Sequence, residues 1–160
     1  MILFLFLFGL VLGELPPSDI QEVPLVRGSC PLFWFSFNGD CYKYISTRLT
    51  WADAEIQCMS EGAHLVSIHS AEEQNFVKTL IMNFDPAIGY TWIGLNDIYK
   101  EGTWMWSDGS AVNFTFWKAG EPNNSLGKEN CVQTWTSDTT WNDYTCQSMF
   151  SFICASRTVC

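Results

Sequence analysis

The sequence GEPNNSLGKENC, Gly120 to Cys131, is followed ten residues later by the tripeptide WND, Trp141 to Asp143. Turns favour Pro and Asn, so the simplest interpretation of the first stretch is a solvated surface loop. The alternative is that acidic and amide side chains from both stretches converge on one ion. That alternative constrains the fold, because two separate parts of the chain must then lie side by side.

The side chains of the two stretches match the ligands that calcium prefers. Calcium takes about six to eight oxygen ligands from carboxylates, amide carbonyls and water. The available carboxylates and amides are those of Glu121, Asn123, Glu129, Asn142 and Asp143. An Asn that binds through its carbonyl oxygen can still donate from its NH₂ group, and a carboxylate keeps acceptor lone pairs. The set predicts a calcium site where two adjacent sugar hydroxyls bind the ion, donate to Glu and accept from Asn.

The first 29 residues differ in composition from the rest of the chain. Residues 1–13, MILFLFLFGLVLG, are apolar and uncharged. They are too short to span a bilayer and predict a secretory signal cleaved near Gly13, rather than a buried helix or strand. Residues 14–29 contain three prolines and predict an extended leader, with further processing after Arg27 left open. One domain over residues 30–155 and a tail over residues 156–160 complete the chain of 160 residues.

Charge and cysteine content restrict the function and the compartment. The formal net charge is −9, and no basic stripe could neutralise phosphates, so we expect no nucleic-acid partner. No second long apolar segment follows the first, so we expect a secreted, extracellular protein with no membrane partner. Seven cysteines without a C-x-x-C pair predict disulfide bonds rather than metal thiolates. Spacing alone leaves their pairing open, and one of the seven must lack a partner within the chain.

Local patterns predict an α+β fold. Thr50 and Ser70 each begin a capping-box pattern, T-W-A-D and S-A-E-E, so helices are predicted after each, the first ending at Gly62 and the second before Asp85. Short strands are predicted over residues 64–68, 90–95, 103–106, 131–135 and 151–155. The long polar segment between Trp106 and Cys131 is predicted to be a functional loop.

Catalysis is not indicated by the residues present. His64 and His69 are the two histidines, and there is no G-x-S-x-G or H-E-x-x-H motif. Each His is interpreted as a hydrogen-bonded structural residue. Carboxylate pairs for glycoside hydrolysis are not excluded by residue type, but no pair stands out. We therefore predict that the protein is not an enzyme.

Several motifs together carry a family resemblance that covers residues 30–155. In order they are CP, CYKY, WADAEIQC, LVSIHSAEE, WIGL, EPN, ENC, WND and FIC. This order resembles the C-type lectin-like domain of the long form, and in layout the small secreted lectins of fish, the venom lectins and the type II antifreeze proteins. The resemblance implies two helices flanking short antiparallel β-sheets, a long calcium-binding loop and disulfide staples.

The resemblance also implies specific pairings and ligands. The disulfides would be Cys30–Cys41, Cys58–Cys154 and Cys131–Cys146. Cys160 is then left over and predicts a disulfide-linked homodimer, with a free or capped thiol as the alternative. The five residues named above match the family's sugar-binding calcium site without substitution, and the backbone carbonyl of Asp143 is also expected to bind. The peptide bond before Pro122 is expected to be cis.

A second calcium site of the family corresponds to Asp97, Glu101, Asn124, Glu129 and Asn130. Two of these positions carry Asn where the family commonly has Asp, so we expect the site to be weak or empty. The EPN motif implies mannose-type sugars by analogy, whereas QPD would imply galactose. Neighbouring aromatic residues such as Trp135 and Tyr144 can redirect this selectivity, so galactose remains an alternative.

Two N-glycosylation sequons occur, at Asn113 and at Asn123. A glycan on Asn123 would destroy the calcium site, so we expect the glycan on Asn113. Two further alternatives to sugar binding are ice binding, as in the antifreeze relatives, and protein targeting, as in venom relatives. The smaller number of cysteines disfavours the first, and the intact ligand set disfavours the second.

Overall fold

Both helices begin at the capping residues that the sequence predicts. In the computed structural model, which describes residues 23–157, α1 spans Trp51–Ser60 and α2 spans Ala71–Phe84. The hydroxyls of Thr50 and Ser70 each accept a hydrogen bond from the backbone N–H three residues on, at 3.3 and 3.1 Å. Each bond satisfies an N–H group that the first helical turn leaves unpaired. The prediction of two helices is confirmed.

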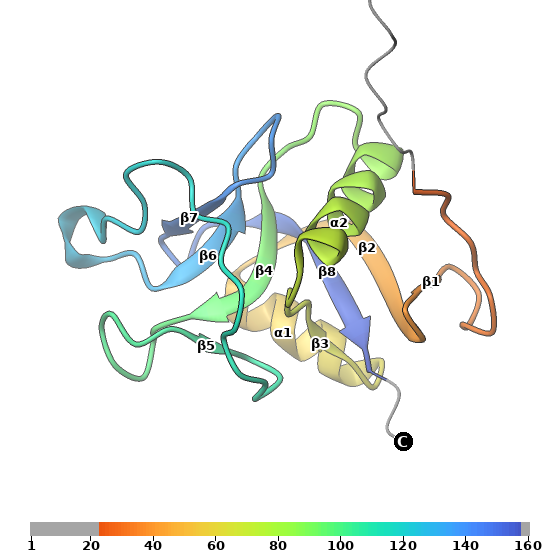
Figure 1. Ribbon diagram of the computed structural model, residues 1–160. Helices are drawn as coiled ribbons and strands as arrows, with labels where there is room; N and C mark the ends of the chain where they lie inside the picture. Colours follow the sequence, from red (N-terminus) through yellow and green to blue (C-terminus); the bar gives the residue numbers. More distant parts are fainter. Residues whose placement is uncertain (1–22, 158–160) are drawn as a thin grey trace, which may run out of the picture.

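The strands form one sheet in the order β1-β2-β8-β4-β6-β7, with β3 paired to β8 and β5 paired to β4 (Figure 1). All pairs are antiparallel except β4 with β8. A short 3₁₀ turn, η1, lies in the loop before β6. The bounds are β1 Phe35–Phe37, β2 Asp40–Leu49, β3 His64–Leu65, β4 Thr91–Asn96, β5 Met105–Trp106, η1 Ser125–Gly127, β6 Cys131–Thr134, β7 Trp141–Tyr144 and β8 Phe150–Ser156.

The predicted strands differ from the observed ones in number and length. The strands predicted at residues 90–95, 131–135 and 151–155 correspond to β4, β6 and β8. The strands predicted at residues 64–68 and 103–106 shorten to the two-residue strands β3 and β5. Three strands, β1, β2 and β7, were not predicted. β1 has only three residues, and β2 and β7 do not alternate cleanly between apolar and polar residues.

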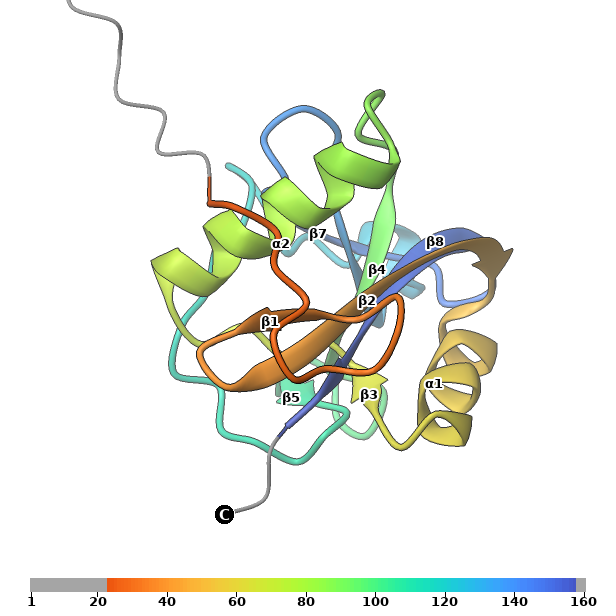
Figure 2. The same ribbon diagram turned by 90° about the vertical axis from the view of Figure 1, so that its right-hand side faces the viewer.

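Two apolar clusters flank the sheet, one for each helix. Phe76, Leu80 and neighbouring residues of α2 pack with Ile93 of β4 and Trp141 of β7. Trp51 and other residues of α1 belong to the second cluster. Figure 2 shows the two helices on opposite sides of β2 and β8. The expected fold class, α+β with two helices flanking a sheet, is therefore confirmed.

The disulfide bonds join the cysteine pairs that the resemblance implies. Cys30–Cys41, Cys58–Cys154 and Cys131–Cys146 have Cα separations of 5.7, 5.4 and 5.2 Å. The second of them ties α1 to β8, across 96 residues of sequence. A bond that closes so long a loop restricts the unfolded chain strongly.

Both ends of the described chain lie on the β1–β2 side of the molecule. Val26 forms an antiparallel bridge with Ser36, and Val23 and Leu25 pack against the core. At the other end Arg157 donates one hydrogen bond to Asp40 and one to the Tyr42 hydroxyl. Figure 1 shows η1 at the opposite side of the molecule from both ends. The predicted signal segment, the first part of the leader and Cys160 lie outside the described residues.

Candidate functional site

Two neighbouring elements carry the predicted calcium ligands. Asn142 and Asp143 lie on β7, which pairs with β6 so that Asp143 is opposite Val132. The remaining ligands lie in the loop that leads into β6. The Cys131–Cys146 bond joins the start of β6 to the segment after β7. A paired strand and a disulfide therefore bring together the two sequence stretches that were predicted to converge.

Asp143 is the buried anchor of the loop. It is 0% exposed, and its two carboxylate oxygens accept hydrogen bonds from the backbone N–H groups of Asn123 at 3.1 Å and Asn124 at 2.7 Å. Asp143 thus fixes the loop directly after the Glu121–Pro122 peptide bond, which is cis as the resemblance implies.

Glu129 closes the other end of the loop. It is 8% exposed, and its carboxylate accepts from the Ser125 N–H at 2.7 Å. In return the Glu129 N–H donates to the Asn124 side-chain oxygen at 3.1 Å. Burial raises the pKa of Glu129, and the charge of Asp143 acts in the same direction. The loop therefore places two carboxylates close together.

Glu121 adds a third carboxylate with one oxygen unused. Its Oε1 accepts from the Asn123 side-chain amide at 3.3 Å. Its Oε2 is buried and has no hydrogen-bond partner within residues 23–157. Burial, followed by the carboxylates of Asp143 and Glu129, raises the pKa of Glu121 to about 7. A divalent cation would relieve both the unsatisfied oxygen and the crowding of negative charge.

Asn142 offers a second unused oxygen. Its side chain is 5% exposed and makes no hydrogen bond to any part of the described chain. An amide without an internal partner is free to bind a cation through its carbonyl oxygen. Within residues 23–157 no three His, Cys, Asp or Glu side chains form a metal cluster by themselves. The amide oxygens of Asn123 and Asn142 are therefore needed beside the carboxylates, a donor set that suits Ca²⁺ rather than Zn²⁺.

The second predicted site is arranged differently. The Asn130 amide donates to Asp97 Oδ1 at 2.9 Å and to Glu101 Oε2 at 3.0 Å, and so bridges the two acids. Asp97 Oδ2 accepts from the Gly102 N–H at 2.8 Å. The side-chain oxygen of Asn124 faces the Glu129 N–H instead of these acids. The donor NH₂ of Asn130 thus lies between the two acids, where it competes with a cation for both carboxylates.

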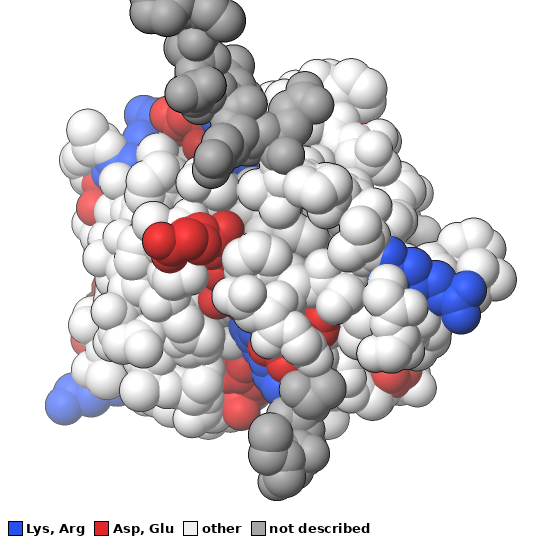
Figure 3. Space-filling model, turned by 45° about the vertical axis from the view of Figure 1, so that its right-hand side comes forward, with Lys and Arg blue, Asp and Glu red and all other residues white. Residues whose placement is uncertain are grey.

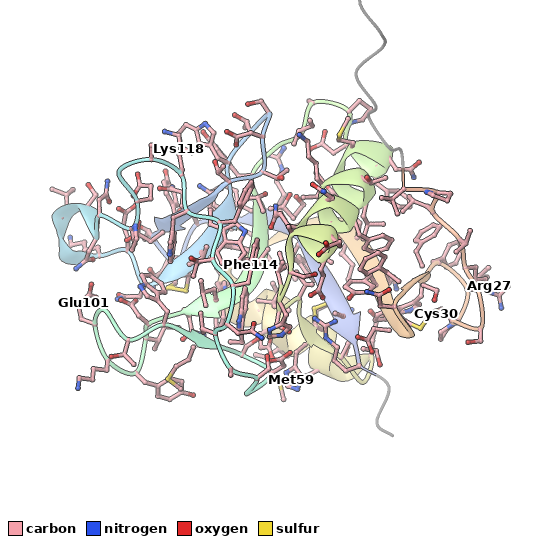
Figure 4. All side chains as sticks on the ribbon, in the orientation of Figure 1. Arg27, Cys30, Met59, Glu101, Phe114 and Lys118 are labelled. Carbon is pink, nitrogen blue, oxygen red and sulfur yellow. A yellow bond between two sulfur atoms is a disulfide. The ribbon has the colours of Figure 1, made fainter. Side chains whose placement is uncertain are left out.

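The two aromatic residues proposed to influence selectivity are engaged in internal contacts. Trp135 packs against Tyr90 with ring centroids 5.4 Å apart, and Lys118 Nζ lies 4.6 Å from the Trp135 centroid. Tyr144 packs against Phe150 at 5.6 Å. Sequence reasoning did not single out Lys118, although its position three residues before Glu121 was a visible signal. Figure 4 labels it in the loop beside β7.

Both histidines are hydrogen-bonded, as expected for structural residues. His64 Nδ1 lies 2.5 Å from Glu55 Oε1, and His69 contacts the Ser67 hydroxyl at 3.0 Å. His69 Nδ1 also lies 2.9 Å from the side-chain oxygen of Asn113. Asn113, the predicted glycosylation site, is exposed in the long loop. Neither histidine contacts any of the five predicted calcium ligands.

The described surface shows no extended basic area on the face drawn in Figure 3. There the described Lys and Arg side chains lie apart from one another, separated by uncharged atoms. None of the helices within residues 23–157 has the length and apolar character needed to cross a membrane.

Comparison with known proteins places this arrangement in one family. The profile of the Lectin C-type domain matches residues 47–156. A C-type lectin of Micrurus corallinus is 46% identical over 79% of this chain and 82% of its own length. A C-type lectin mannose-binding isoform of Oxyuranus scutellatus is 42% identical, covering 80% and 84%. The galactose-specific lectin nattectin of Thalassophryne nattereri is 40% identical, covering 81% of each chain.

Solved structures agree with the sequence comparison. The C-type lectin CEL-I from Cucumaria echinata superposes with a TM-score of 0.77 and 35% identity, over 79% of this chain and 96% of its own. The herring type II antifreeze protein superposes with a TM-score of 0.74 and 38% identity, covering 81% and 100%. The chain therefore belongs to the C-type lectin family of carbohydrate-binding proteins and is not an enzyme.

Proposed function

We propose that this protein is a secreted, calcium-dependent lectin that binds mannose-type sugars. The observation that carries the proposal is Glu121 Oε2, a buried oxygen of the predicted ligand set that has no hydrogen-bond partner within residues 23–157. The side chain of Asn142, which is 5% exposed, supports it, because it makes no hydrogen bond in the same part of the chain. Both residues belong to the same predicted ligand set as Asp143. Oxygen atoms left unsatisfied in the protein alone are satisfied if a cation binds there.

The residues of the site would have different roles in sugar binding. Glu121, Asn123, Glu129, Asn142 and Asp143 would hold the ion, and bound calcium supplies coordination positions for two adjacent sugar hydroxyls. The carboxylates of Glu121 and Glu129 accept the hydroxyl protons, while the NH₂ groups of Asn123 and Asn142 donate to the hydroxyl oxygens. The alternation of acceptor and donor selects a pair of hydroxyls with a fixed orientation.

Mannose is favoured by the order Glu-Pro-Asn and by the mannose-binding relative. The similarity to a galactose-specific lectin supports the alternative sugar. Chromatography on immobilised mannose and immobilised galactose, each with calcium and with EDTA, tests both. We expect retention on mannose that EDTA abolishes. Retention that EDTA does not change would contradict the calcium mechanism, and retention on neither column would contradict sugar binding.

Ice binding is a second candidate, because a type II antifreeze protein is among the similar structures. Thermal hysteresis measured with calcium and with EDTA tests it independently of the sugar columns. We expect no hysteresis. A clear hysteresis combined with no retention on either column would replace the lectin proposal.

We also propose that the protein is secreted and forms a disulfide-linked homodimer through Cys160. Three disulfide bonds and the apolar N-terminal sequence suit an oxidising compartment. The six bonded cysteines leave Cys160 as the seventh. Two linked sites would bind a multivalent glycan more tightly than either site alone.

A further inference from the structure

Lys118 is held beside the candidate calcium site by its backbone. Its N–H donates to the Trp141 carbonyl at 2.8 Å, and its carbonyl accepts from the Glu121 N–H at 2.9 Å. The first bond joins it to the residue before Asn142, and the second to a predicted ligand. These two bonds therefore fix the Lys118 backbone relative to the candidate calcium site.

The Lys118 side chain is directed by an aromatic ring. Its Nζ lies 4.6 Å from the centroid of Trp135, within the range of a cation–π contact. Trp135 is in turn braced by Tyr90. A lysine chain that would otherwise sample many rotamers is thus restricted to one side of the loop.

Lys118 forms no direct ion pair in the described part of the chain, although its positive charge acts on the Glu121 carboxylate. The four ion pairs among residues 23–157 involve Lys43, His64 and Arg157 instead. A fixed ammonium group without an ion pair, next to a ligand site, is available to a charged ligand. A neutral sugar bound through two hydroxyls would leave it unused.

We propose that Lys118 forms a subsite for an anionic ester, sulfate or phosphate, carried by the sugar that binds at the calcium site. This inference rests on the proposed function. Three carboxylates around a divalent cation leave one negative charge, which a neighbouring ammonium offsets. The anionic group would therefore approach a site whose local charges sum to about zero, although the whole chain carries a net charge of −9. At physiological salt the long-range repulsion is screened beyond about 8 Å.

The test compares neutral and anionic sugars in the same assay. Binding of methyl mannoside and methyl galactoside is measured against their 6-sulfate and 6-phosphate derivatives, with calcium at physiological salt. For the sugar that binds, we expect at least one anionic derivative to bind about three- to tenfold more tightly than its neutral parent. The sulfate and phosphate arms distinguish which ester the subsite prefers.

Three variants locate the effect. Lys118→Gln is expected to reduce the anionic-to-neutral ratio to about one, and Lys118→Arg to retain it, because charge rather than shape carries it. Lys128→Gln removes an equal charge from the same loop and is expected to leave the ratio unchanged. A wild-type ratio near one, or a ratio that Lys118→Gln does not lower, would overturn the subsite alone. Failure of both neutral sugars to bind would overturn the proposed function and the subsite with it.

Discussion

Asn142 tests the calcium proposal at the scale of one residue. We expect Asn142→Ala to lower calcium affinity at least tenfold, because one amide ligand is lost, and to abolish sugar retention. The side chain has no hydrogen bond within the described residues, so truncation leaves no partner unpaired. The unfolding temperature in EDTA should then change by less than about 4 °C. Calorimetric titration and thermal unfolding measure the two effects.

The matched control for this variant is Asn83→Ala, which removes an exposed amide from α2. It should leave both calcium affinity and sugar retention unchanged. Wild-type calcium affinity in the Asn142→Ala protein would contradict the assignment of this residue as a ligand.

Asp108, which is not one of the predicted calcium ligands, should make the stability of the fold depend on pH. Burial alone would raise its pKa, but hydrogen bonds from Ser110 and Ser67 and the charge of Arg157 outweigh burial and lower it. A lowered pKa in the folded state stabilises the protein above the unfolded pKa, and this stabilisation is lost as the pH falls through the folded pKa. Asp108→Asn should therefore lower the free energy of unfolding at pH 7. The gap between wild type and variant should shrink below about pH 4.

Urea unfolding of wild type and Asp108→Asn at pH 7, 5 and 3 measures this difference. Glu72→Gln, which removes one exposed carboxylate from α2, controls for the change in net charge. A difference between wild type and Asp108→Asn that is the same at all three pH values would show that the carboxylate does not act through its ionisation.

We expect one of the two sequons to carry a glycan and the other to be bare. Asn113 is exposed, and its oxygen faces His69 Nδ1, which leaves its amide nitrogen for a glycan. Both side-chain groups of Asn123 are in use, with Glu121 and with Ser125. Mass spectrometry of protein secreted from eukaryotic cells should find Asn113 occupied and Asn123 bare, and Asn113→Gln should remove the glycan. Substantial occupancy at Asn123 would contradict the calcium site.

At the scale of elements, the sequence predicts what local chemistry determines. The capping residues Thr50 and Ser70 locate both helices, because side-chain bonds to the first turn are made within four residues. The strand β2 was missed because it lacks a clean alternation, and most of its length pairs with β8, more than 90 residues away in sequence. Long-range pairing of this kind leaves little trace in local periodicity.

The site shows the same division between local and long-range information. Residue types alone predicted the five-residue ligand set, and the structure brings Asp143 into contact with the loop that contains Asn123. The sequence did not reveal that β7 is a strand, because an Asn-Asp pair is unfavourable for strands in isolation. It also did not reveal that Trp135 lies under Lys118. Both facts depend on tertiary packing.

At the scale of elements, we also predict how a substitution at the second family site changes stability and calcium binding. The Asn130 amide bridges Asp97 and Glu101, so Asn130→Asp replaces two hydrogen bonds with a third negative charge. In EDTA the variant should be less stable by about 1–3 kcal/mol. With calcium, titration calorimetry should show two bound ions in place of one. Asn83→Asp is the charge-matched control, and two ions bound by the wild type would contradict the proposal that Asn130 blocks this site.

At the scale of the whole molecule, the fold separates the candidate site from the chain ends. Glu121 to Glu129 and β7 lie toward one side, and η1 is opposite both ends of the described chain (Figure 1). The disulfide Cys58–Cys154 fixes β8, which leads to the C-terminus, and Arg157 is bonded to Asp40 and Glu73 just beyond it. The direction in which the chain leaves the domain is therefore set by the core.

This separation favours a bivalent dimer. Cys160 follows the anchored Arg157 by three residues, so a bridge between two copies would join them on the side away from their sites. We expect a covalent dimer on a non-reducing gel and Cys160→Ser to be monomeric, with unchanged binding of a monovalent sugar. Agglutination should fall at least tenfold in the variant, because the second contact is no longer intramolecular. A wild-type protein that runs as a monomer without reductant would contradict the bridge, and undiminished agglutination by Cys160→Ser would show that valency arises elsewhere.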